Sequence, residues 1–186
     1  MRILVAFASR CGSAREIAQA IAGTLRSAGH VVDVRPAAEV GDVTVYDAVV
    51  LGSAIYNRAW LPEATELVRR GRRALRDRPV WLFSVGSLSS ARGWPLGALA
   101  QQEPKAIARL RAGIAPRDYH VFAGVIDPDR FSLVGRLIVK ILYGRYGDLR
   151  NWAEIDAWAR GIAHQLADSQ TASRAAPPGA LVGVQE

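Results

Sequence analysis

Six residues near the start of the chain, 9–14, have the composition of an anion-binding loop. They read Ser-Arg-Cys-Gly-Ser-Ala and lie between a short apolar run and a segment with helical periodicity. The first amides of a helix lack helical partners, and the helix dipole favours negative charge there. Ser9 and Ser13 add hydroxyl groups, and Gly12 allows the backbone to approach an anion closely. Arg10 adds a positive charge, so we expect a phosphate or another anion to bind at this loop.

The spacing of the loop does not fit three common phosphate-binding motifs. A dinucleotide fingerprint requires G-x-G-x-x-G and a P-loop requires G-x-x-x-x-G-K-[ST], and neither occurs here. A cysteine phosphatase loop requires an arginine six residues after the cysteine. Ile17 holds that place after Cys11, and Arg15 comes too early. An ordinary strand-to-helix turn without a ligand stays open as an alternative.

Short apolar strands that alternate with amphipathic helices predict an α/β fold with a doubly wound, five-stranded parallel sheet. We expect the strand order 2-1-3-4-5 with helices on both faces, and a ligand site beside the first strand, where the order changes direction. We also expect one domain, 1–168, and a disordered tail, 169–186, that is rich in Ala, Ser, Pro and Gly. The expected strands are 2–7, 31–35, 48–51, 79–85 and 119–125, and the expected helices are 13–28, 62–76, 104–112, 131–146 and one that Asn151 caps.

Small and polar residues follow three of the expected strands, in loops 9–14, 52–57 and 86–90. Because the carboxyl ends of parallel strands meet at one edge of a sheet, three such loops together indicate a ligand site. The second loop carries Tyr56 and continues to Trp60, and either ring could stack on a flat ligand. The alternative is that these rings pack on the core.

Several segments resemble one branch of the flavodoxins. The stretch 7–18, Phe-Ala-Ser-Arg-Cys-Gly-Ser-Ala-Arg-Glu-Ile-Ala, is similar to the flavodoxin phosphate loop Ser/Thr-x-Thr-Gly-x-Thr, with Cys11 and Ala14 in place of two hydroxyl residues. The stretch 121–124, the basic segment after it and Asn-Trp-x-x-Ile at 151–155 resemble the menaquinone-dependent protoporphyrinogen oxidase group. The resemblance runs over nearly the whole chain.

This resemblance implies that FMN is the cofactor and that electrons pass from a reduced substrate through FMN to a quinone. No catalytic acid or base and no metal site stand out, which suits a reaction that a flavin carries. A non-enzymatic electron carrier and a flavodoxin-fold module without FMN stay open as alternatives. The residues that the resemblance implies for FMN are Ser9, Arg10, Cys11, Gly12, Ser13 and Ala14, then Ser53, Ala54, Ile55, Tyr56 and Asn57, and finally Gly86, Ser87 and Leu88.

The net charge of +7 favours anionic partners. A single cysteine excludes an internal disulfide, and no signal peptide or long apolar run is visible, so we expect a cytoplasmic protein. The segment 131–146 has an apolar stripe flanked by basic residues, which fits either peripheral contact with an anionic membrane or packing on the sheet or in a homodimer. The arginines of 69–78 could attract an acidic partner or phospholipid. Aromatic residues do not alternate with them, so we expect no specific nucleic acid.

Overall fold

Five parallel strands form the central sheet of the structure, which is a computed structural model that describes residues 1–86, 104–126 and 147–175. Their order is β2-β1-β3-β5-β6, and each neighbouring pair runs parallel. Apart from the short added strand β4, this is the predicted order 2-1-3-4-5, so the predicted fold class is confirmed. The strands are β1 (Arg2–Ala8), β2 (Val31–Pro36), β3 (Ala48–Tyr56), β5 (Val80–Gly86) and β6 (Asp118–Ala123).

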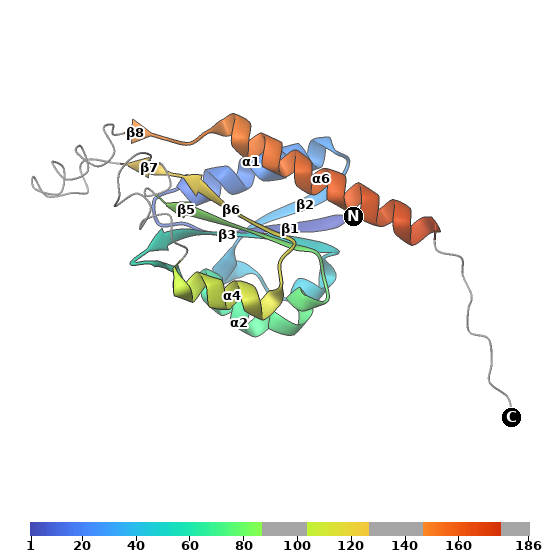
Figure 1. Ribbon diagram of the computed structural model, residues 1–186, viewed down its shortest axis with the longest axis horizontal. Coiled ribbons are helices and arrows are strands. Elements are labelled where there is room, and N and C mark those ends of the chain that lie inside the picture. Colours follow the sequence, from blue (N-terminus) through green and yellow to red (C-terminus); the bar gives the residue numbers. More distant parts are fainter. Residues whose placement is uncertain (87–103, 127–146, 176–186) are drawn as a thin grey trace, which may run out of the picture.

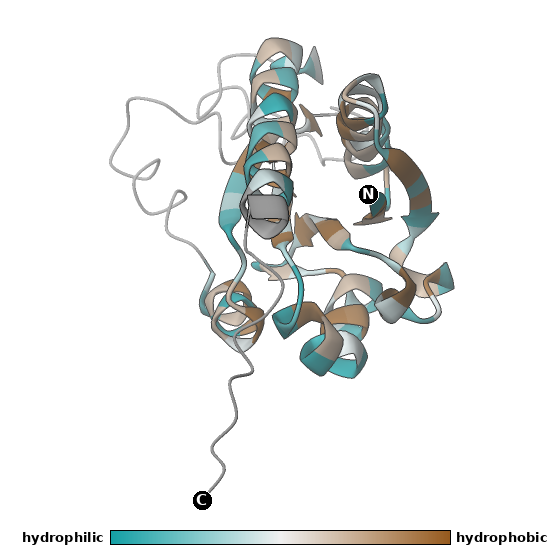
Figure 2. Cartoon of the chain, turned by 90° about the vertical axis from the view of Figure 1, so that its right-hand side faces the viewer, coloured by the Kyte–Doolittle hydropathy of each residue, from teal (hydrophilic) through white to brown (hydrophobic). Residues whose placement is uncertain are grey.

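Helices cover both faces of the sheet. On one face α1 (Ser13–Ser27) packs beside α6 (Trp152–Ala175), and on the other α2 (Pro62–Arg76) packs beside α4 (Lys105–Ile114) (Figure 1). Figure 2 looks along the strands and shows the sheet between these two helical layers. Two short 3-10 helices, η1 (Ala37–Glu39) and η2 (Val43–Val45), lie on the α2 side between β2 and β3. The helix predicted at 131–146 lies outside the described residues.

Side-chain periodicity explains why α1 forms and how it packs. Ile17, Ile21 and Leu25 recur at helical spacing, and all three are completely buried against the sheet. The strands beneath are packed as closely. A Cβ built on Gly52 of β3 would lie 1.9 Å from Cζ of Phe83 in the neighbouring strand β5. The ring of Phe83 therefore occupies space that only a glycine leaves open.

The strand β3 is longer than the sequence analysis predicted. It continues to Tyr56, so residues 52–56, which were predicted as a loop, belong to the strand. The chain then turns back into β4 (Ala59–Trp60), which pairs antiparallel with β3. Gly52 and Ser53 are typical of loops, whereas Ile55 and Tyr56 favour strands, so the composition of this segment alone did not decide between the two.

The carboxyl-terminal part of the chain also differs from the prediction. The helix α6 continues to Ala175, so residues 169–175, predicted to be disordered, are helical, and their Ala and Gln content is compatible with a helix. The strand predicted at 119–125 is divided into β6 and the short β7 (Val125–Ile126), which pairs antiparallel with β8 (Gly147–Asp148). No helix in the described part of the chain combines the length and apolarity needed to cross a membrane.

Candidate functional site

Gly12 shapes the loop that joins β1 to α1. Its φ is +90°, in the left-handed region that glycine adopts without strain, and it directly precedes the first turn of α1. Its amide donates a hydrogen bond to Oγ of Ser9 over 3.0 Å, and its carbonyl accepts one from the amide of Glu16 over 2.9 Å. The hydrogen bonds of the loop itself therefore fix its shape.

The first turn of α1, which directly follows this loop, has backbone amides that are free to donate hydrogen bonds. The amides of Ser13, Ala14 and Arg15 form no hydrogen bond with any described residue, and no side chain caps the helix. Ala14 is completely buried in the core, so it contributes an amide to the loop while its side chain packs inside. Cys11 is exposed and forms no disulfide. Three adjacent donors at a helix N-terminus are the chemistry that an anion requires.

A pocket of about 500 Å³ lies beside the loop, at the carboxyl end of β1. Its volume is within the range typical of small-molecule sites. Two arginines and two glutamates contribute charge to it, so the charged groups at its wall balance. The lining residues are Phe7, Ala8, Ser9, Arg10, Cys11, Gly12, Arg15, Glu16, Pro36, Ala37, Ala38 and Glu63.

Residues 53–57 form a β-hairpin rather than the predicted loop. Asn57 and Arg58 connect β3 to β4 with φ values of +49° and +59°, as a two-residue hairpin turn requires. Ser53 is completely buried, and its hydroxyl donates to the carbonyl of Ala54 and accepts from the amide of Leu61. Ser53 thereby joins the hairpin to the start of α2.

The two aromatic side chains of this segment have different surroundings. Trp60 is 4% exposed, and its Nε1 donates to Oγ of Ser84 over 2.7 Å, so it belongs to the core and the predicted alternative of stacking on a ligand is wrong for this residue. Tyr56 is 52% exposed. The guanidinium of Arg10 lies over its ring, 4.4 Å from the centroid. Tyr56 is therefore in direct contact with the loop that precedes α1.

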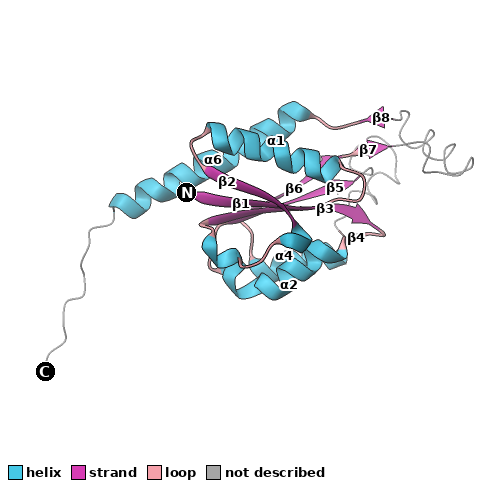
Figure 3. Ribbon diagram, turned by 180° about the vertical axis from the view of Figure 1, so that it is seen from behind, coloured by secondary structure: helices cyan, strands magenta, loops and turns pink. Residues whose placement is uncertain are grey.

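The sheet brings the predicted segments to one edge. Ser53 of β3 lies opposite Ala8 of β1 and Ser84 of β5, so these three strands end side by side. A Cβ built on Gly86, the last residue of β5, would meet Ile55 at 3.5 Å. Figure 3 shows this end of the sheet, opposite the N-terminus, together with β4, β7 and β8. The third predicted loop lies outside the described residues after Gly86, and this part includes the predicted site residues Ser87 and Leu88.

A charged cluster that was not predicted from the sequence joins α1 to the segment before α6. The side chain of Arg150 is 9% exposed, and its guanidinium donates to Glu16 over 2.6 Å and to both carboxylate oxygens of Asp148 over 2.8 and 2.7 Å. It also lies over the ring of Trp152. The hydrogen bond from Arg150 holds the pKa of Asp148 below its usual value. Glu16 and Arg150 are 134 positions apart, so no local spacing could have revealed this pair.

This cluster matters for the loop because Glu16 lies in the first turn of α1. Its Oε1 is 3.4 Å from the place where a Cβ on Gly12 would stand. A carboxylate beside the free amides repels an anion that binds to them. The ion pair with Arg150 compensates this negative charge.

Comparison with known protein families matches residues 4–148 to the family described as flavodoxin domain. This chain belongs to the flavodoxin-domain family. The cofactor of this flavodoxin domain is therefore FMN.

Curated relatives and solved structures agree with the assignment as a flavodoxin domain. The protoporphyrinogen IX dehydrogenase [quinone] of Escherichia coli K12 is 27% identical over 183 residues, which cover 92% of this chain and 99% of that protein. A flavodoxin from the domain Archaea superimposes with a TM-score of 0.55 at 15% identity, over 90% of this chain and 99% of that one. The rubredoxin oxygen:oxidoreductase of Desulfovibrio gigas gives a TM-score of 0.58 at 14% identity, over 90% of this chain and 36% of that one. These two structures share the fold of this flavodoxin domain.

Proposed function

We propose that this protein is an FMN-dependent oxidoreductase that passes electrons from a reduced substrate to a quinone. The observation that carries the proposal is the loop 9–14 of a flavodoxin domain: its residues 9–12 line a pocket, and the uncapped first turn of α1 follows directly. The choice of a quinone as acceptor rests on similarity along 99% of the length of a relative named protoporphyrinogen IX dehydrogenase [quinone].

The loop fits the phosphate end of FMN. We assign the phosphate to the amides of Ser13, Ala14 and Arg15, with the hydroxyl of Ser13 and the backbone of Cys11 and Gly12 beside them. The positive φ of Gly12 supports this assignment, because the chain there has no side chain between the backbone and a bound anion.

We assign the flavin ring to the hairpin and the end of β5. The hydroxyl of Ser53 is used within the hairpin, so the contacts fall to the backbone of residues 54–57, to the side chain of Tyr56 and to Gly86. Arg10 belongs to the loop 9–14 and places its guanidinium over the ring of Tyr56, where it can balance the negative charge of the cofactor. The segment 87–88 stays a predicted third border of the ring.

FMN held by the loop 9–14 would supply the two-electron chemistry, so the protein has to supply binding and position rather than an acid or a base. The donor loses two electrons and two protons, and the quinone gains both and becomes a quinol. The buried Ser84, which Trp60 and Tyr119 both hydrogen-bond, keeps the strand ends under the assigned ring fixed.

The test is an anaerobic assay of the protein loaded with FMN. Protoporphyrinogen IX is supplied as donor and a menaquinone as acceptor, and porphyrin fluorescence and quinol formation are followed together. We expect both signals to rise only when protein, FMN and quinone are all present. FMN binding without either signal would assign the protein to electron transport without catalysis, and a failure to bind FMN would refute the assignment of the loop.

A further inference from the structure

The two helical layers carry very different charges. The helix α2 contains five arginines and two glutamates, and α4 contains three cations and no acidic residue. Together these two helices have a net charge of +6, and the whole chain has a net charge of +7. The charges of α1 and α6 cancel. Figure 1 shows α2 and α4 side by side below the sheet. We call their outer surface the basic face.

The cations of the basic face are turned away from the sheet. In α2 the apolar residues face the core, whereas Arg69, Arg73 and Arg76 recur at positions i, i+4 and i+7 on the exposed side. In α4 the exposed residues Lys105 and Arg109 are likewise one turn apart. The regular spacing places these charges in one continuous strip along each helix.

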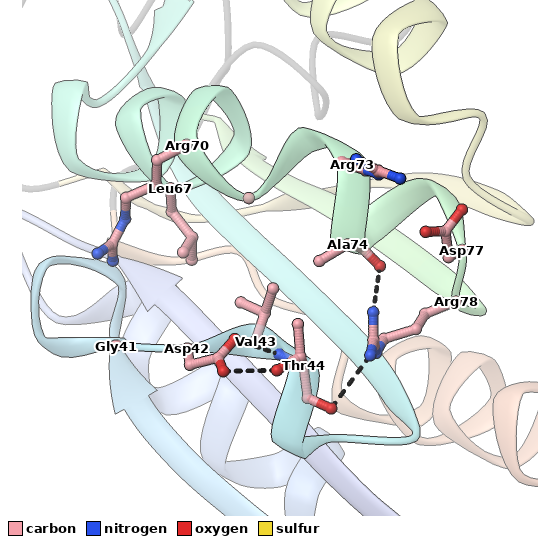
Figure 4. Close-up of a pocket in the computed structure, with 11 residues that line it drawn as sticks. Gly41, Asp42, Val43, Thr44, Leu67, Arg70, Arg73, Ala74, Asp77 and Arg78 are labelled. Carbon is pink, nitrogen blue, oxygen red and sulfur yellow. Dashed lines mark hydrogen bonds between the residues drawn. The ribbon is translucent and has the colours of Figure 1, made fainter.

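Some arginines of this layer hold the fold together, and others have no such role. Arg72 donates from Nε to the carbonyl of Gly113 over 3.1 Å, which joins α2 to α4. Arg78 donates to three backbone carbonyls, and Figure 4 shows two of these bonds at the pocket of about 550 Å³ between η2 and α2. By contrast, Arg73, Arg76 and Arg109 form no hydrogen bond or ion pair with any described residue. The latter three are available to a partner.

Large hydrophobic side chains are not part of the basic face. Those of the described residues that are exposed lie elsewhere, on other elements than α2 and α4. Specific protein interfaces usually have an apolar or aromatic core, and a basic patch without one is typical of adsorption on a charged surface. The composition of the face therefore favours a layer of phospholipid headgroups over a folded acidic protein.

We propose that the basic face docks on an anionic lipid bilayer through its phospholipid phosphates. The docking itself needs neither FMN nor a substrate. Its orientation is useful under the proposed function, because α2 begins beside the cofactor pocket, which Glu63 of its first turn lines. A bilayer against α2 then lies near the rim of that pocket, and a membrane-dissolved quinone is within reach of it.

The test compares two variants of equal net charge in vesicle flotation. In the face variant, Arg73→Gln, Arg76→Gln and Arg109→Gln remove three exposed cations of the basic face. In the control, Ala157→Glu, Ala167→Glu and Gln170→Glu add three acids at exposed positions of α6, on the opposite layer. Both lower the net charge by the same amount, and thermal unfolding checks that both fold. Vesicles contain phosphatidylcholine with about 30% phosphatidylglycerol, at about 0.1 M salt.

We expect the unaltered protein to float with anionic vesicles and not with pure phosphatidylcholine. The face variant should partition about 100-fold less well, whereas the control should change by less than about threefold. Equal losses of vesicle binding in both variants would show that only the net charge matters. Equal vesicle binding by the face variant and the unaltered protein would show that another surface of the protein binds the vesicles. Either result overturns the proposal, as does retention on a heparin column without vesicle binding, which would indicate another polyanion. Activity with FMN in a detergent solution of quinone tests the proposed function separately.

Discussion

Substitution of Arg150 by methionine tests whether the charged cluster supports cofactor binding. Methionine keeps much of the length and apolar volume of the side chain, but it removes the guanidinium that pairs with Glu16 and Asp148. The carboxylate of Glu16 then faces the free amides of α1 without compensation. We expect FMN to bind less tightly, because its phosphate meets this negative charge.

The size of the effect follows from the geometry. Glu16 Oε1 lies 3.4 Å from the place of a Cβ on Gly12. For a phosphate at about 7 Å from this carboxylate, two unit charges interact by about 1–2 kcal/mol at an effective dielectric constant of roughly 20–40. The side chain of Glu16 is 46% exposed, so salt screening keeps the value near the lower end. We expect the Kd of FMN to rise about tenfold.

The assay titrates FMN and riboflavin separately into the protein freed of flavin and follows the quenching of flavin fluorescence. Riboflavin has the ring but no phosphate, so Arg150→Met should change its Kd by less than about twofold. The double variant Arg150→Met with Glu16→Gln removes the uncompensated carboxylate and should regain most of the affinity for FMN. Thermal unfolding of each variant measures the structural contribution of the cluster independently.

Two results would refute this reasoning. Equal losses of FMN and riboflavin affinity would show that Arg150 acts on the shape of the site and not on its charge. A double variant that binds FMN as poorly as Arg150→Met alone would show that Glu16 does not oppose the phosphate. Weaker binding at high salt in the unaltered protein, together with a smaller effect of the substitution there, would support the electrostatic origin.

Three further predictions follow from the packing and the charges. Gly12→Ala places a side chain on a residue with left-handed backbone, so the protein should lose about 1–2 kcal/mol of stability and bind FMN less tightly. Urea unfolding and the FMN titration measure the two effects. In the same experiments Gly41→Ala, where a Cβ meets no neighbouring atom, should change neither value. Gly52→Ala places a Cβ 1.9 Å from the ring of Phe83, so we expect a loss of at least about 3 kcal/mol or no soluble protein, measured by urea unfolding and expression. The pKa of Asp148 is lowered in the folded state, so the unfolded chain binds more protons than the folded protein at acidic pH. The stability that results is present above the ordinary pKa of about 4 and is lost as the pH falls below it. The free energy of unfolding, measured between pH 7 and pH 3, should therefore depend less on pH once the guanidinium of Arg150 is removed.

The fold could be predicted because its signals are local. Continuous apolar runs such as 48–51 and 80–83 indicate buried parallel strands, and the spacing of Ile17, Ile21 and Leu25 indicates a helix that lies on them. The hairpin was missed because its turn, Asn57-Arg58, has no glycine at either left-handed position.

The candidate site could be predicted only in part. The loop 9–14 was visible because a glycine and two serines at a strand-to-helix junction have few other uses, and the structure places free amides there. The roles of the aromatic residues were not visible, because Trp60 and Tyr56 are four positions apart in one segment and only the hairpin decides that one ring is buried and the other exposed. The pair of Glu16 and Arg150 needs tertiary structure.

The arginines illustrate why a net charge does not by itself identify a partner. Arg150 forms ion pairs with two carboxylates beside the loop 9–14. Arg78 donates hydrogen bonds to three backbone carbonyls away from that loop. Arg73 and Arg76, close to Arg78 in sequence, have no described partner. Loss of an arginine of the first kind removes several hydrogen bonds that join separate segments of the fold. Loss of the second kind leaves the fold intact and changes only what the surface attracts, so stability and binding measured on the same variants separate the two uses.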